Sequence, residues 1–403
     1  PNPKYGDLTG VGISAIVLLS ILLIARFAKG FLANVSVLMG ILIGGVLSVA
    51  MGLMDFSKVA KAEWFTMVLP FEIATPVFDP ILILTMSLVM VVVMIESTGM
   101  FLALGDMTDR KISQDELTRG LRTDGLGTLI GGIFNTFPYT SFSQNVGLVA
   151  VTGVKSRWVC VAGGVILIVL GVLPKMGALV ESLPTVVLGG AGLVMFGMVA
   201  STPVDEMLPA GKLTALGLQH VLVMYAGAVA VPLIVGRALN LPPEQVAHLI
   251  SADLFCCGLI TLIQAMGATQ WFGIKLPVMM GVTFASVAPM VSMAQSTGGS
   301  AGAGLIFGSV IGAGIVSILI APLISRMLRF FPPVVTGTII AVIGISLMRV
   351  GVNWIFGNPV GPTAPSVPNP EHLKWLADAQ ATAGAPGSSL PPVPKGFAVV
   401  PTI

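Results

Sequence analysis

The chain has 403 residues, of which 55% are apolar and only 9% are charged, whereas soluble domains carry about 25% charged residues. This composition excludes a soluble globular protein and indicates an integral membrane protein. Lys and Arg number 20 against 18 Asp and Glu, and the resulting net charge of +2 argues against nucleic acid as a partner.

A membrane-spanning helix needs about 20 apolar residues. The stretches that meet this requirement are, in chain order, 8–28, 35–54, 81–102, 158–176, 185–200, 213–235, 246–266, 302–324 and 334–350. Three weaker stretches, 126–137, 142–152 and 278–293, are short and interrupted by polar residues, Gly or Pro. Together they predict an all-α polytopic protein with about twelve membrane segments.

Basic residues gather in alternate connections between these segments, which fixes an orientation by the positive-inside rule. These residues are Arg26, Lys29, Arg110, Lys111, Arg119, Arg122, Lys155, Arg157, Arg326 and Arg329. With all of them inside, the first segment runs from outside to inside. The three weaker segments must then be counted as crossings or half-crossings.

Two of the weaker segments are the candidates for a binding site. Residues 135–147 and 276–289 each contain a hydroxyl–Phe–small core, Ser141-Phe142-Ser143-Gln144 in one and Thr283-Phe284-Ala285-Ser286 in the other. Irregular backbone at membrane depth is tolerated where protein or a water-filled cavity satisfies it, and paired broken segments point to a transporter site. We expect each to supply an extended piece and a half-helix with free N–H groups facing a ligand. The alternative is a pair of Pro-kinked packing helices.

Ionisable residues inside spans are costly, and function is the default hypothesis for them. Glu96 has no basic residue within a helical turn, so desolvation favours its protonated form and suits it to carry a proton. Asp124 either caps a helix end or acts as a second relay carboxylate. His220 fits a packing or network role better than direct ligand contact. The sequence shows no metal-ligand cluster, nucleophile–base pair or cofactor motif, so we expect no enzyme activity, metal or cofactor.

Gln144-Asn-Val-Gly-Leu-Val-Ala-Val-Thr-Gly153 resembles the signature of the nucleobase–ascorbate transporter family. Glu96-Ser-Thr-Gly-Met100, Asp124-Gly125, Gln219-His220 and Met224-Tyr-Ala-Gly227 are similar to other recurring positions of that family. The stretches 136–144 and 188–198 most resemble its bacterial uric acid and xanthine permease branch.

The resemblance implies a fold of fourteen segments in two inverted repeats, divided into a core and a gate domain, with two short strand-plus-half-helix segments at the midplane. Here the family order is rotated, and nothing resembles the last two segments. The implied division begins with gate-type helices at 1–54, an interfacial or outside connection at 55–80, and the second repeat of the core at 81–200, whose last segment is gate-type. It continues with a linker resembling a family amino terminus at 201–210, the first repeat of the core at 211–325, a gate-type helix at 330–352, and a long exposed loop or tail at 353–403.

The resemblance also implies roles for individual residues. Glu96 matches a purine-binding carboxylate, Gln144 the amide that hydrogen-bonds the purine, and Phe284 the aromatic residue facing the base. Thr283 lies beside Phe284 as a selectivity position, and Phe142 and Ser143 complete the substrate-binding set. Asn145 matches a residue that supports the site, and Asp124 and His220 match a polar network behind it.

The leading hypothesis is therefore a secondary transporter in a bacterial inner membrane that imports uric acid or xanthine together with a proton. The sequence leaves open the choice between the two purines, Na⁺ in place of H⁺, and a homodimer formed through the gate domain. One alternative is an anion transporter of the same fold, against which the Glu96 charge argues. The other is a membrane protein that binds purine but does not transport it.

Overall fold

The computed structural model describes residues 8–28, 35–54, 56–184, 207–296 and 301–326, together with Leu32 and Val187. The predicted segment at 334–350 and the predicted tail at 353–403 lie outside the described residues. So do nearly all of the predicted segment at 185–200 and the first part of the predicted linker at 201–210.

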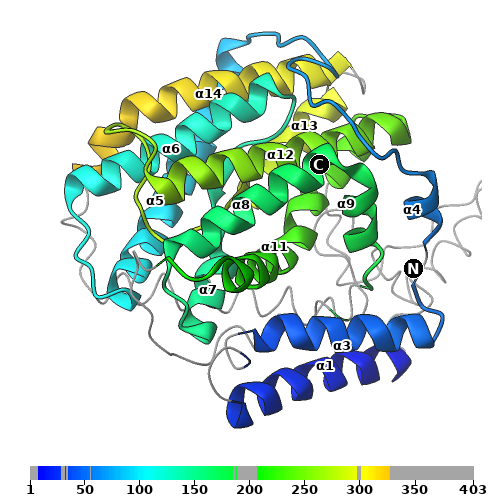
Figure 1. Cartoon of the computed structure of the whole chain (residues 1–403). Helices are drawn as coiled ribbons and strands as arrows, with labels where there is room; N and C mark the ends of the chain where they lie inside the picture. Colours follow the sequence, from blue (N-terminus) through cyan, green and yellow to red (C-terminus); the bar gives the residue numbers. More distant parts are fainter. Residues whose placement is uncertain are drawn as a thin grey trace, which may run out of the picture.

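Helices make up most of the described chain (Figure 1). They are α1 (Leu8–Phe27), α3 (Ser36–Ala50), α4 (Ser57–Lys61), α5 (Pro80–Met107), α6 (Gln114–Ile133), α7 (Ser143–Thr152), α8 (Arg157–Val172), α9 (Pro174–Glu181), α11 (Ala210–Ala238), α12 (Pro243–Met266), α13 (Val287–Ser296) and α14 (Ala301–Ser325). Within the described residues, α5, α11, α12 and α14 are long and apolar enough to cross a membrane, and α1, α3 and α8 are shorter apolar helices. The predicted helical membrane architecture is confirmed.

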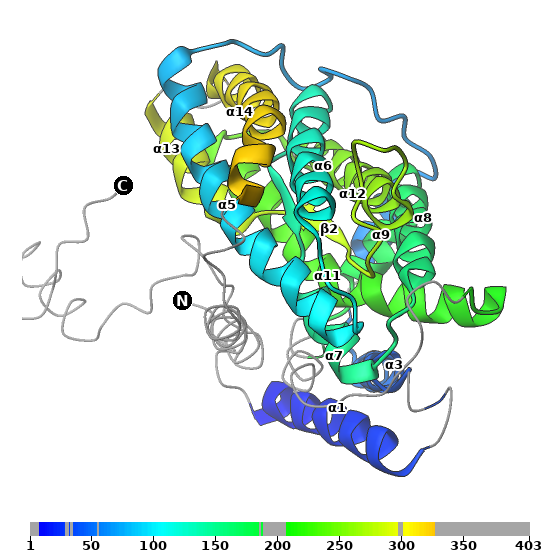
Figure 2. The same cartoon turned by 90° about the vertical axis from the view of Figure 1, so that its left-hand side faces the viewer.

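Two short strands interrupt the helices where the weaker segments predict extended backbone. β1 (Tyr139–Ser141) leads into α7, and β2 (Met280–Val282) leads through a 3-10 turn (Phe284–Ser286) into α13. The strands pair antiparallel, with Thr140 opposite Gly281. Figure 2 shows β2 among the helices of the bundle, and β2 packs against α11 and α12. The interpretation as two Pro-kinked helices is therefore wrong.

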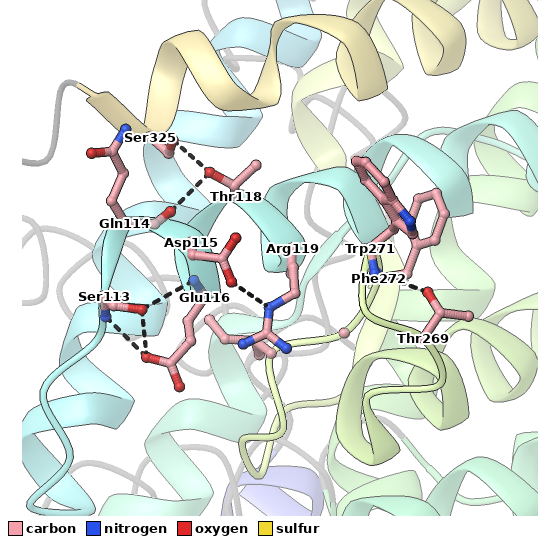
Figure 3. Close-up of polar contacts among 12 residues, drawn as sticks. Ser113, Gln114, Asp115, Glu116, Thr118, Arg119, Thr269, Trp271, Phe272 and Ser325 are labelled. Carbon is pink, nitrogen blue, oxygen red and sulfur yellow. Dashed lines mark hydrogen bonds and ion pairs between the residues drawn. The ribbon is translucent and has the colours of Figure 1, made fainter.

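Helix α6 begins twelve residues before the predicted segment at 126–137, because a capping box starts it at Gln114. The Ser113 hydroxyl accepts from the Glu116 backbone N–H at 3.2 Å, and the Glu116 carboxylate accepts from the Ser113 N–H at 3.0 Å (Figure 3). Partial burial raises the pKa of Glu116, but the Ser113 hydrogen bonds and the Arg110 guanidinium outweigh it and leave this pKa below its usual value. The cap is therefore ionised and intact at neutral pH.

Closely approaching helices build the core at two crossings, α6 with α14 and α8 with α12. Both crossings depend on glycine. A Cβ atom at Gly314 would lie 2.5 Å from the Leu129 backbone nitrogen, and one at Gly258 would collide with the Gly164 carbonyl oxygen. Small residues of this kind allow the close backbone approach that holds membrane helices together.

The α1–α3 pair, which the sequence assigns to a gate, lies at one end of the molecule beside α7 and α11 (Figures 1 and 2). An apolar cluster joins the pair to those two helices; it includes Ile21 of α1, Ile41 of α3, Leu148 of α7 and Leu222 of α11. The pair thus shares an apolar cluster with the half-helix that carries Gln144.

The connection between α3 and α5, which the sequence predicts to be an interfacial or outside segment, has no regular secondary structure after α4 and is tied to the core by hydrogen bonds. The Asn135 side chain accepts from the Ile73 N–H at 2.8 Å and donates to the Ala74 carbonyl at 2.9 Å. Further along, the Val77 N–H donates to the Gly304 carbonyl at 2.8 Å. The connection is therefore held against the end of α6 and against α14.

Candidate functional site

The paired strands form the centre of the candidate site. The first residue of each strand donates a hydrogen bond from its backbone N–H to the hydroxyl of a buried threonine. Tyr139 N–H donates to the Thr128 hydroxyl of α6 at 3.1 Å, and Met280 N–H donates to the Thr261 hydroxyl of α12 at 2.9 Å. An outer strand edge inside a membrane protein needs such partners, because lipid offers none. The two threonines therefore fix the two strands from two different helices, α6 and α12.

These threonines are absent from the predicted site, although the sequence carries a signal for them. Gly125-Leu-Gly-Thr-Leu-Ile130 in α6 and Gly258-Leu-Ile-Thr-Leu-Ile263 in α12 are the same pattern, placed one helix before each strand. The two stretches differ only at their third residue, so this short internal repeat marks both threonines. In addition, the Tyr139 hydroxyl donates to the Asp253 carboxylate of α12 at 2.8 Å, so α12 holds both strands.

Replacing Thr128 or Thr261 with Val is expected to lower the free energy of unfolding by about 1–3 kcal/mol, because each change leaves a buried backbone N–H without a partner. Thermal denaturation of the purified protein in detergent measures the effect. The Thr→Ser variants keep the hydroxyl and should recover most of the loss. Thr85→Val is the matched control, since the Thr85 hydroxyl is exposed and donates only to Ile81 of its own helix. Equal losses in all three Val variants would contradict the prediction.

Two carboxyl groups lie on the helices that pack beside β1. On α5, the Ser97 hydroxyl is 3.2 Å from the Thr140 hydroxyl of β1, which brings the turn with half-buried Glu96 next to the strand. On α6, Asp124 is fully buried and close enough to Glu96 for their charges to interact. Its Oδ1 atom accepts from Gln264 at 3.5 Å, whereas its Oδ2 atom has no hydrogen-bond partner among the described residues. Because Asp124 lies in the middle of α6, the helix-end cap interpretation is wrong.

Asn145 and His220 form a second polar contact, apart from the Asp124–Gln264 contact. The Asn145 side-chain nitrogen donates to the His220 carbonyl oxygen at 3.0 Å and lies 2.9 Å from His220 Nδ1. Both residues are buried. The hydrogen bond joins α7, directly after Gln144, to α11. The described contacts thus place Asp124 and His220 in two separate hydrogen-bonded pairs.

The two phenylalanines that follow the strands have different environments. Phe142 is only 3% exposed, and its ring lies in a slot between Gly227 of α11 and Gly281 of β2, where a Cβ atom would come 2.8 Å and 2.5 Å from it. Phe284 is 44% exposed and borders the same Gly227. Phe142 therefore packs within the protein, and Phe284 is the ring with a free surface.

The start of each half-helix also differs. Thr283 caps the 3-10 turn before α13 by accepting from the Ala285 N–H at 3.2 Å. By contrast, no side chain among the described residues caps α7, which follows Phe142. The first-turn N–H groups of α7, at Ser143 and Gln144, thus lie at a helix end with positive partial charge. This end suits an acceptor or an anion.

A family model described as a permease family matches residues 1–208 and 211–376. The two matches meet at residues 209–210, inside the predicted linker. The uric acid transporter UacT of Escherichia coli is 58% identical over 201 residues, which cover 50% of this chain and 42% of that protein. The xanthine permease of Bacillus subtilis is 48% identical over 49% of this chain and 45% of its own length. The uric acid permease PucJ of the same bacterium is 45% identical over 51% and 46%. Each alignment with these permeases thus spans a little under half of the relative.

Proposed function

This chain belongs to the nucleobase–ascorbate transporter family of permeases, and we propose that it carries an oxidised purine, uric acid or xanthine, across a bacterial inner membrane. It is an integral membrane protein, as the family and its apolar helices show. Import coupled to a proton is part of the proposal. The proposal includes the division into core and gate-type helices that the resemblance to the family implies.

The observation that carries the proposal is the contact between Ser97 and Thr140, which sets the Glu96 turn of α5 against the strand that leads into α7. An oxidised purine is a flat ring with N–H donors and C=O acceptors. A carboxylate at Glu96 accepts from ring N–H groups, and the Gln144 amide both donates and accepts. The uncapped start of α7 suits an anionic purine, and the exposed ring of Phe284 offers a stacking surface.

Proton coupling is proposed to run through the two carboxyl groups beside β1. Glu96 is half-buried and has Asp124 as its acidic neighbour, and like charges on neighbouring acids disfavour ionisation of both groups at once. Asn145 and His220 hold α7 in place from the other side. In this scheme, protonation and purine binding at Glu96 depend on each other.

Uptake into proteoliposomes tests the function. Vesicles holding the purified protein are given labelled uric acid or xanthine under an imposed pH gradient, with and without Na⁺. We expect accumulation that follows the pH gradient and is blocked by unlabelled purines but not by sulfate. Inhibition by sulfate would favour the anion transporter. Purine binding to the protein without any uptake would favour a protein that only binds, and either result would overturn the proposal.

A further inference from the structure

Gln219 of α11 makes a polar contact with the α1–α3 pair. Its side chain is 1% exposed, and its Oε1 atom accepts from the Leu38 backbone N–H of α3 at 2.9 Å. Leu38 is the third residue of α3, so its N–H group has no partner within its own helix. Val35, at the N-cap position, offers no side-chain acceptor. Gln219 therefore caps the start of α3 from another helix.

Apolar side chains pack around this hydrogen bond. Val37 and Leu38 of α3 are buried in a cluster with Leu216 and Val223 of α11. Apolar packing is non-directional, so it holds two helices together without fixing how one is shifted along the other. A hydrogen bond is directional and short, so it does fix that position. The contact at Gln219 thus sets the register of α3 on α11.

The next residue along α11 faces the site. His220 receives the hydrogen bond from Asn145, which follows Gln144 in α7. Successive residues of a helix point about 100° apart, so Gln219 and His220 can bind different neighbours from the same turn. One turn of α11 therefore connects the half-helix of the candidate site to the α1–α3 pair.

We propose that Gln219 is a positioning residue that holds α3 in one register relative to α7 and α11, and that this bond breaks and re-forms when the α1–α3 pair moves during transport. The inference rests on the proposed function. The bond stabilises the arrangement seen here over any arrangement that lacks it. A contact shifts the equilibrium between two arrangements only if its free energy differs between them. This hydrogen bond exists in only one of the two arrangements, so it favours that one.

Gln219→Met removes the acceptor and keeps the size of the side chain. We expect labelled uric acid to bind the purified variant within about twofold of the unaltered protein, while the maximal uptake rate changes about fivefold or more, as the loss of one hydrogen bond implies. Hydrogen exchange at the start of α3 should be faster, whether or not the protein transports. Gln245→Met, at an exposed position of α12, is the matched control.

A second variant separates positioning from simple capping. In Val35→Thr/Gln219→Met, the new hydroxyl at the N-cap position can accept from the Leu38 N–H, but it gives no link to α11. We expect thermal stability to recover and the altered uptake rate to persist. Recovery of both would show that only the cap matters and would overturn the proposal, as would an unchanged rate or a lost affinity in Gln219→Met. Absence of uptake by the unaltered protein would instead refute the proposed function.

Discussion

Replacing Glu96 with Gln is expected to abolish the accumulation of purine driven by a pH gradient while leaving the protein folded. Gln has nearly the same shape as Glu, but it cannot take up a proton and accepts through only one oxygen. Losing a hydrogen bond to a charged group costs about 1.5–3 kcal/mol, which corresponds to a fall in affinity of roughly ten- to a hundredfold. Initial uptake rates and the steady-state purine ratio in proteoliposomes measure the two effects.

Glu244→Gln is the matched control, because Glu244 is an exposed acid in the first turn of α12. This variant should accumulate purine like the unaltered protein. Thermal denaturation of both variants checks that loss of uptake does not reflect unfolding. If Glu96→Gln still concentrated purine with an unchanged dependence on pH, the proposed coupling would fail.

The broken segments could be predicted from the sequence because their pattern is local. A Phe between a hydroxyl residue and a small residue, inside a stretch too short and too polar to span, predicts an extended piece followed by a half-helix. β1 with α7 and β2 with α13 confirm both. Hydropathy likewise predicts α5, α11, α12 and α14, because each contains an apolar stretch long enough to cross a membrane.

The start of α6 was missed for a physical reason. Hydropathy scores a segment by its mean. The first half of α6 carries Arg119 and Arg122, and Asp124 follows in the middle of the helix, where protein rather than lipid surrounds it. The Ser113-x-x-Glu116 capping box marks the true start in the sequence. Contacts between distant segments, such as Gln219 with Leu38, depend on packing, and neither local pattern nor composition contains them.

Phe142 shows the same limit at the site. It shares the hydroxyl–Phe–small pattern with Phe284, and the sequence assigned both rings to the substrate. Only the packing distinguishes them, because Gly227 and Gly281 enclose Phe142 and leave Phe284 partly exposed. Substitution of these glycines should therefore have a large effect on stability and uptake.

Gly281→Ala is expected to disrupt the site through Phe142. The new methyl group would lie 2.5 Å from Phe142 Cδ2 and 3.1 Å from Met224 Cε, in a fully packed region. Overpacking of this kind costs about 1–3 kcal/mol, and relief requires Phe142, the residue before α7, to move and take Gln144 with it. We expect a lower denaturation temperature and uptake reduced tenfold or more.

Gly12→Ala, where a Cβ atom meets nothing within 4 Å, should change neither. Adding Phe142→Leu to Gly281→Ala makes room for the methyl group and should restore part of both properties. A single Gly281→Ala variant with full stability and full uptake would show that Phe142 does not set the position of α7.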